Sequence, residues 1–428
     1  MVNLRFGKVR IRGKQLVGII FYLTLFMGFL IDDMRLPSAI RFLNDFIVLA
    51  LLIMLIKEPQ LFGRLTAYGA GSVLIAMVCY TIVNIVSVIL NRVPLNLVLW
   101  ATRNTYRFFV FFIGCIIYLD AEDIEKTFSR LYRIQWFNLL TVMYQFFVLG
   151  LKQDFLGGIF GHGGNAGLLI YSVLLLGYAM TKYIRREYTV KQFLFIFLST
   201  SLISVLAEIR VFFVIVILTL GINFVFNVSR RGWVRKAGIA LVGVALFLIA
   251  VEIYAALFPY VELSFAALFK EGNSTGGGYN ISRLGAFGDI NDIFFHGDIY
   301  KNLLGLGFGN CEYSSISIFN SAFYERYGHL NYRWFTHQWI FLESGYLGIL
   351  SYLSIIVAVF IASWKQRKKT SVPLKSLNLV PMIMSMTCGV MFIYNSLLKA
   401  DYGYIAFWGL AIAFVLIKTE KMRKIIEK

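Results

Sequence analysis

Arg210, Arg283 and His337 are the residues of this chain best suited to bind an anion and move a proton. Arg210 stands between two apolar runs, and a charge so near a membrane is costly and usually faces a cavity or a partner. Arg283 follows a glycine-rich segment, and a guanidinium group can bind two phosphate oxygens at once. His337 stands where a polar segment turns apolar again, and an imidazole could act as a base on a sugar hydroxyl.

Each of these residues also has a structural interpretation. Arg210 and the nearby Glu208 could form a solvated ion pair in a short turn, and Arg283 could simply be solvated. His337 could be an ordinary interfacial histidine. Glu343 follows His337 by six residues, about 1.7 helical turns, so these two side chains would lie on different faces of a helix.

Arg103, Arg107 and Arg333 are further candidates for binding an anionic substrate. Arg103 and Arg107 are four residues apart, so they share one helix face. Like charges on one face repel each other unless an anion or an acidic residue lies between them. The alternative is that both arginines extend to lipid phosphates.

The glycine and cysteine patterns indicate no cofactor. No GxxxxGK[ST] segment and no strand–GxGxxG–helix unit is present, so the sequence predicts neither a nucleotide site nor ATP-driven transport. The four cysteines show no CxxC pair, and therefore neither a metal site nor a disulfide is expected.

The elements that must position these residues are predicted to be transmembrane helices. Apolar residues make up 59% of the chain and charged residues 15%, whereas soluble domains contain about half apolar and about a quarter charged residues. Apolar runs long enough to cross a bilayer recur along the chain. About 12 helices are expected near residues 15–30, 42–56, 66–90, 105–119, 134–151, 166–181, 193–207, 210–227, 238–257, 337–363, 376–396 and 404–418.

Charge placement predicts how these helices are oriented. Most of the 41 lysines and arginines fall in alternate connections and at both termini. Because positive residues stay on the cytoplasmic side, both termini are expected there. The basic excess then marks topology rather than nucleic-acid binding. Residues 120–133 are interpreted as an interfacial amphipathic helix.

The chain is therefore expected to be an all-α polytopic membrane protein in three parts. Residues 1–257 hold transmembrane helices 1–9, residues 258–336 form one large outer loop, and residues 337–428 hold helices 10–12 and a cytoplasmic tail. The outer loop is the only long polar segment. It includes the glycine-rich run GNSTGGG, which would serve as a mobile lid or linker.

Four short segments resemble the bacterial O-antigen polymerase and O-antigen ligase superfamily. GIFGHGGNAGLLIY is similar to the family's start of a mid-chain helix, with Asn165 at its asparagine. EIRVFFVIVILTL places Arg210 at the family's helix-heading arginine, and ISRLGAF followed by LLGLGFGN supplies Arg283 and a Gly-x-Gly segment. THQWIFLESGYLG resembles the family's histidine and Gly-x-x-Gly close, with His337 at the histidine.

The resemblance implies glycosyl transfer on the outer face of the cytoplasmic membrane. The donor would be a glycan on undecaprenyl pyrophosphate, and neither nucleotide nor metal would be needed. Arg210 and Arg283 would bind the pyrophosphate, and His337 would orient or deprotonate the acceptor hydroxyl. The partners implied are the lipid-linked oligosaccharide, membrane lipids and a chain-length regulator.

Three functions fit this reading. A repeat-unit polymerase extends another lipid-linked glycan, whereas a ligase transfers the polymer to lipid A–core. His337 lies about one helical turn closer to the Gly-x-x-Gly segment than the ligase histidine does, which favours the polymerase. A flippase or transporter without chemistry is the third. Transporters commonly contain internal repeats, and no repeat relates the two halves of this chain.

Overall fold

The computed structural model describes residues 3–6, 9–226, 281–367 and 374–427, with scattered positions between 236 and 252. The expected helix 238–257 and the glycine-rich run 272–278 lie largely or wholly outside the described residues. Before this interval, the helices are α1 (Gly13–Asp32), α2 (Leu43–Ile56), α3 (Leu61–Ala67), α4 (Gly71–Asn91), α5 (Leu95–Tyr118), α6 (Ala121–Phe147), α7 (Asn165–Ile184), α8 (Val190–Leu206) and α9 (Arg210–Phe226). After it come α12 (Ala286–Ile290), α13 (Ile299–Leu304), α14 (Ala322–Tyr327), α15 (Thr336–Gln366), α16 (Val380–Tyr394) and α17 (Gly403–Ile426).

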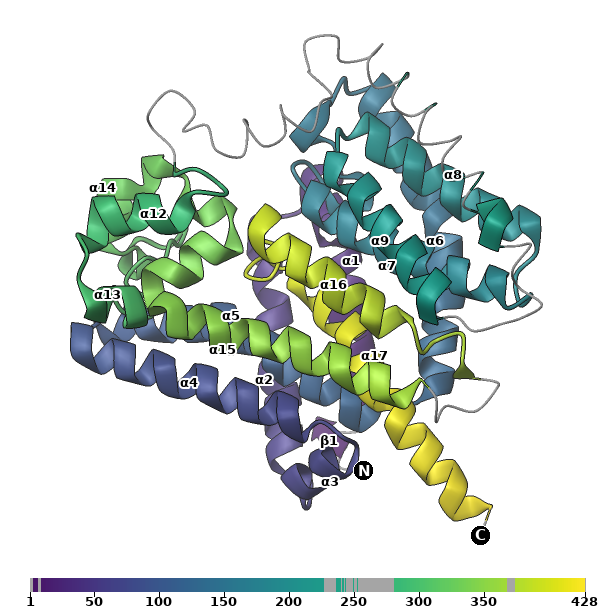
Figure 1. Cartoon of the computed structure of the whole chain (residues 1–428), viewed down its shortest axis with the longest axis horizontal. Coiled ribbons are helices and arrows are strands. Elements are labelled where there is room, and N and C mark those ends of the chain that lie inside the picture. Colours follow the sequence, from purple (N-terminus) through teal and green to yellow (C-terminus); the bar gives the residue numbers. More distant parts are fainter. Residues whose placement is uncertain are drawn as a thin grey trace.

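In the part of the chain that the structure describes, the fold is helical, as expected, apart from one hairpin. Strands β1 (Asn3–Phe6) and β2 (Val9–Arg12) pair antiparallel immediately before α1. The short helices α12, α13 and α14 lie together at one end of the bundle (Figure 1). We call this end, which carries residues 281–335, the loop end.

Residues 120–133 do not form a separate interfacial helix, so that prediction is wrong. Residues 121–133 are the first half of α6, which continues to Phe147 without a break, and Asp120 is the N-cap residue. Asp120 starts the helix through a capping box, in which its side chain accepts from the backbone N–H of Asp123 at 2.9 Å. Such a cap satisfies N–H groups that have no partner within the helix. No glycine or proline follows that would end the helix before Phe147.

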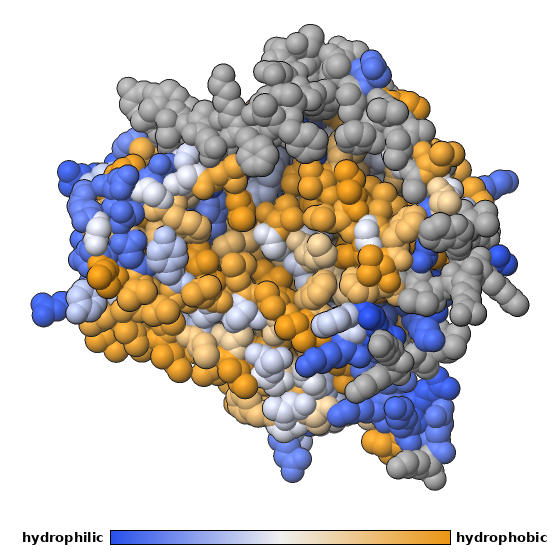
Figure 2. Space-filling model, viewed as in Figure 1, coloured by the Kyte–Doolittle hydropathy of each residue, from blue (hydrophilic) through white to orange (hydrophobic). Residues whose placement is uncertain are grey.

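Six helical segments in the described part of the chain are long and apolar enough to cross a membrane. They are α1, α4, α7, α15, α17 and the segment Ser38–Ile56, which includes α2. The shorter apolar helices are α8, α9 and α16. On the face shown in Figure 2, apolar surface forms a band over α4 and α15. Hydrophilic surface covers α12 and α14 on one side of this band and the region near the C-terminus on the other.

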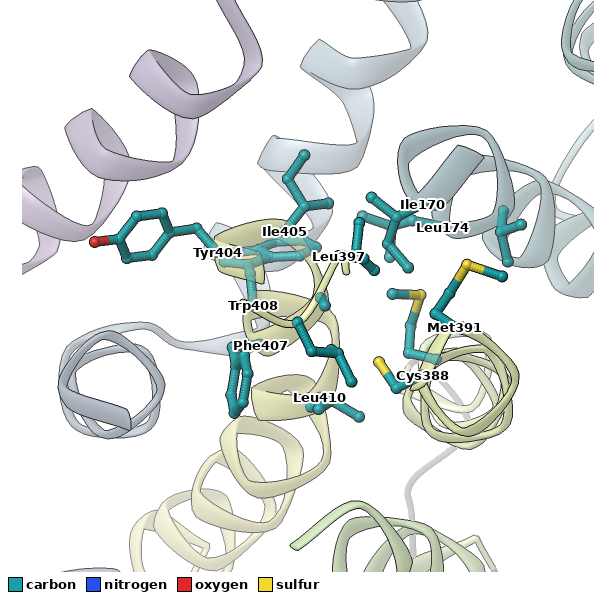
Figure 3. Packing of buried hydrophobic residues seen from close by; sticks show 14 of the residues in the cluster. Ile170, Leu174, Cys388, Met391, Leu397, Tyr404, Ile405, Phe407, Trp408 and Leu410 are labelled. Atoms are coloured by element: carbon teal, nitrogen blue, oxygen red, sulfur yellow. The ribbon is translucent and has the colours of Figure 1, made fainter. Parts of the chain in front are cut away.

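Helix α17 forms the centre of the bundle. All residues from Gly403 to Leu416 are buried. The Phe407 ring stacks on that of Phe108 of α5, and the Trp408 ring lies against those of Phe21 of α1 and Phe128 of α6. Met391 and Cys388 extend from α16 on the other side of α17 (Figure 3). Between membrane helices, close packing of this kind, rather than exclusion of water, supplies most of the association free energy. Packing of α17 in the core therefore fixes the position of the connection between α16 and α17, which lies at the loop end.

Candidate functional site

A basic cavity of about 500 Å³ lies at the loop end of the bundle. Its lining comes from α1, α2, α5, the start of α15, the connection between α16 and α17, and the loop segments near residues 314 and 333. The positively charged residues of this lining are Arg41, Arg103, Arg107, Arg333 and Lys399. Its aromatic residues are Phe42, Trp100, Tyr313, Trp339 and Tyr402. We call it the basic cavity.

Arg103 and Arg107 face the basic cavity from the same side of α5. The acidic residue that their spacing requires is Asp45 of α2, which forms an ion pair with Arg103 and lies 3.6 Å from Arg107. Arg107 also contacts Asp401 at 2.8 Å. The two guanidinium groups are thus held close together at a fixed place by carboxylates from two other parts of the chain.

Aromatic rings orient the guanidinium groups of Arg333 and Arg103. The Cζ atom of Arg333 lies 4.0 Å from the ring centroid of Tyr313 and 5.4 Å from that of Trp339. The Cζ atom of Arg103 lies 4.7 Å from the centroid of Trp100. Trp100 is itself fixed, because its indole N–H donates to the carbonyl of Tyr313 at 2.9 Å. Cation–π contacts of this kind leave the N–H edges of an arginine available to an anion.

A buried ionic triad, Glu312–Lys399–Glu343, lies beside the basic cavity. The ammonium of Lys399 donates to Glu312 Oε1 at 3.0 Å and to Glu343 Oε2 at 2.9 Å. All three side chains are at most 1% exposed. Burial opposes the charge of this ammonium, yet the pKa of Lys399 is raised because the two carboxylates adjoin it. Asn104 of α5 completes the arrangement by donating to Glu312 Oε2 at 2.7 Å.

A break in α15 positions Glu343. Gly345 has φ 61° and ψ −161°, a conformation essentially restricted to glycine. The break frees the carbonyls of Leu342 and Glu343, which accept from Leu306 N at 2.7 Å and from Gly307 N at 3.1 Å. The glycine-rich segment after α13 therefore packs directly against the break.

Arg283 and His337 lie together at the start of α15 but do not line the basic cavity. The His337 ring is buried, with Nε2 2.9 Å from the carbonyl oxygen of Arg283 and Nδ1 3.3 Å from that of Phe392. The Arg283 guanidinium packs over the rings of Phe335 and Tyr394, each at 4.8 Å. Both ring nitrogens of His337 thus face backbone oxygens rather than a substrate space.

Arg210 and Asn165 also lie outside the lining of the basic cavity. Each begins a helix where the sequence predicted a helix start, Asn165 at α7 and Arg210 at α9. Arg210 pairs with Glu208 at 2.7 Å, and Asn165 donates to Asp154 at 2.5 Å. Of the predicted site residues, the structure therefore brings Arg103, Arg107 and Arg333 to the cavity and Glu343 next to it.

Sequence reasoning missed Arg41, Glu312, Lys399 and Asp401. The signal for Lys399 and Asp401 was a lone pair of charges, KAD, between two apolar runs near the C-terminus. Nothing in the sequence connects these residues to Glu312, which lies 87 positions before Lys399.

The described residues contain no group of three or more His, Cys, Asp or Glu side chains that could hold a metal ion. No family model matches this chain, and no curated protein matches it.

Proposed function

We propose that this chain is a membrane glycosyltransferase that polymerises oligosaccharide repeat units carried on undecaprenyl pyrophosphate. The observation that carries the proposal is the basic cavity, where five cationic residues and several aromatic rings converge at the polar end of a bundle of membrane-length helices. The sequence resemblance to the O-antigen polymerase and ligase superfamily supports the same chemistry.

The proposal assigns the basic cavity to the diphosphate of the donor. Arg103 and Arg333 would bind the phosphate oxygens and stabilise the negative charge that grows on the leaving group. Lys399, buried between Glu312 and Glu343, would hold the wall of the cavity in place. Trp100 and Trp339 would hold the guanidinium groups of Arg103 and Arg333 in place. No nucleotide or metal takes part.

The lipid tail would leave the basic cavity along α2. Phe42 and Asn44 line the cavity, and the neighbouring Leu43 and Phe46 are 43% and 70% exposed. Leu49, Ile53 and Ile56 continue this exposed apolar stripe along the helix. A polyprenyl chain could therefore lie against the stripe inside the bilayer while its diphosphate occupies the cavity.

In this proposal the protein crosses the membrane with about twelve helices, and both termini lie in the cytoplasm. The loop end then faces outward, where lipid-linked repeat units are joined. Arg283 and His337 hold the start of α15 in place, and Arg210 stabilises the turn before α9. None of these three residues is assigned a contact with the diphosphate.

Elongation by purified protein tests the proposal. The full-length chain in detergent, supplied with undecaprenyl-pyrophosphate-linked single repeat units, is expected to produce a ladder of longer glycans. Arg333→Ala should lower the rate by about 10²-fold, the usual cost of losing one donor to a developing negative charge. Arg326→Ala is the matched control, because Arg326 is an exposed arginine at the same end that does not line the cavity.

Other outcomes would contradict the proposal in distinct ways. Glycan transfer to lipid A–core without elongation would identify a ligase. Movement of the lipid-linked unit across vesicle membranes with no new glycosidic bond would identify a transporter. Equal rates for Arg333→Ala and the wild-type protein would remove the cavity from the reaction.

A further inference from the structure

Asp401 is the only carboxylate among the described residues that line the basic cavity. It lies in the connection between α16 and α17, and its side chain is 39% exposed. No histidine or cysteine is present in this lining. A proton that leaves a substrate in the cavity therefore meets one acceptor of suitable chemistry.

The surroundings hold Asp401 in one orientation. One carboxylate oxygen, Oδ1, contacts Arg107 Nη1 at 2.8 Å, and Arg107 is itself 6% exposed. The backbone is fixed on both sides, because Ala400 N donates to Ser396 O at 3.0 Å and Gly403 N donates to Ala400 O at 2.9 Å. Oδ1 is engaged by Arg107, and the partial exposure leaves the carboxylate accessible to a substrate hydroxyl.

The neighbouring acidic residues and His337 cannot serve in its place. Glu312 and Glu343 are fully buried and both hold Lys399. Asp45 pairs with two arginines and does not line the cavity. Both ring nitrogens of His337 face backbone carbonyls.

We infer that Asp401 is the catalytic base that deprotonates the acceptor hydroxyl, with Arg107 as its positioning residue. This inference rests on the proposed function. The proton of the acceptor O–H passes to an oxygen of Asp401, and the hydroxyl oxygen uses a lone pair to form the new bond to the anomeric carbon. The bond from that carbon to the diphosphate oxygen breaks, and its electron pair leaves with the diphosphate. Water then takes the proton from Asp401.

The test compares turnover with donor binding in Asp401→Asn. The amide oxygen of asparagine can keep the contact with the Arg107 guanidinium, so the cavity is expected to keep its shape, but an amide cannot accept the proton. We expect kcat for elongation to fall by about 10²- to 10⁴-fold, the range for loss of a general base. Affinity for undecaprenyl pyrophosphate alone, measured by calorimetry in detergent, should stay the same or increase, because a negative charge has left the cavity.

The pH profile and two further variants sharpen the result. A reaction that requires an ionised general base slows towards low pH, so the wild-type kcat should show that fall and the residual kcat of Asp401→Asn should not. Asp401→Glu should recover part of the rate. Asp292→Asn is the matched control, because Asp292 is an exposed carboxylate at the loop end outside the cavity lining.

Three results would overturn the inference. The first is a normal kcat in Asp401→Asn. Loss of turnover in His337→Gln would then assign the role of base to His337. The second is a parallel loss of binding and turnover in Asp401→Asn, since a residue needed only for packing would behave in that way. The third is an unchanged pH profile in that variant. Absence of elongation by the wild-type protein would instead overturn the proposed function itself.

Discussion

At the scale of single residues, Lys399 joins carboxylates from two distant parts of the chain. Glu312 comes from the loop after α13, and Glu343 comes from the break in α15. Moving charges out of water is costly, and the cost is recovered only when the partners are close and well oriented. The triad therefore fixes the wall of the basic cavity only while all three members are present.

Lys399→Met is expected to destabilise the protein by about 3–5 kcal/mol, because it leaves two buried carboxylates without their cation. Thermal unfolding in detergent, followed by circular dichroism, measures the change. Lys57→Met is the control. Because Lys57 is exposed, this variant should unfold at the same temperature as the wild-type protein. Glu343→Gln added to Lys399→Met should restore part of the loss. A wild-type melting temperature for Lys399→Met would show that the triad does not stabilise the fold.

The sequence predicted how residues are arranged where they are close to each other in the chain. Arg103 and Arg107 are four positions apart, which predicted both their shared face and the need for an acidic residue between them. The identity of that residue, Asp45, could not be predicted, because it lies 58 positions before Arg103 and reaches it only through packing of α2 on α5. Lys399, Glu312 and Asp401 were missed for the same reason.

At the scale of elements, the break in α15 joins two glycine segments that the sequence had shown separately. A Cβ atom at Gly345 would lie 2.4 Å from the backbone carbon of Leu303, and one at Gly305 would lie 2.4 Å from that of Glu343. Two backbones therefore touch at this point. Ser87 of α4 secures the contact by donating to the carbonyls of Leu304 at 2.6 Å and of Glu343 at 2.9 Å.

Gly345→Ala should therefore destabilise the protein and disturb Glu343. The backbone conformation alone costs about 1–3 kcal/mol for a residue other than glycine, and the overlap with Leu303 adds to this cost. Unfolding by heat in detergent measures the effect. Gly389→Ala, in the interior of α16 where a Cβ atom would meet nothing within 4 Å, should be neutral or slightly stabilising. Equal destabilisation of the two variants would contradict the packing argument.

Elements were predictable where hydrophobic periodicity and length decide the structure. The helical fold with membrane-length helices is confirmed, and the predicted starts at Asn165 and Arg210 agree with α7 and α9. The error at residues 120–133 has a physical cause. Charged residues at the start of α6 suggested an interfacial helix, but the same amphipathic pattern continues into the bundle, where Gln135 and Asn138 are also buried. Burial of polar residues by neighbouring helices is not encoded locally.

At the scale of the whole molecule, the proposed function needs the loop end to face outward. The hydrophilic surfaces over α12 and α14 and near the C-terminus lie on opposite sides of the apolar band (Figure 2). The last turns of α17 carry Lys421, Arg423 and Lys424, which favour the cytoplasmic side. If the C-terminus is cytoplasmic, the basic cavity opens on the far side of the membrane, where no nucleotide sugar is present.

Cysteine labelling in whole cells tests this orientation. Cys79 is exposed, whereas Cys115, Cys311 and Cys388 are buried, so Cys79→Ala gives a background that should resist labelling. In that background, Ser317→Cys at the loop end is expected to react with a membrane-impermeant maleimide on cells whose outer layers have been made permeable. Met422→Cys near the C-terminus should react only after the cytoplasmic membrane is opened. Both introduced cysteines replace exposed residues, so a difference between them reports the side of the membrane rather than burial. The reverse pattern would place the basic cavity in the cytoplasm, and a polymerase of lipid-linked units on the outer face would then be excluded.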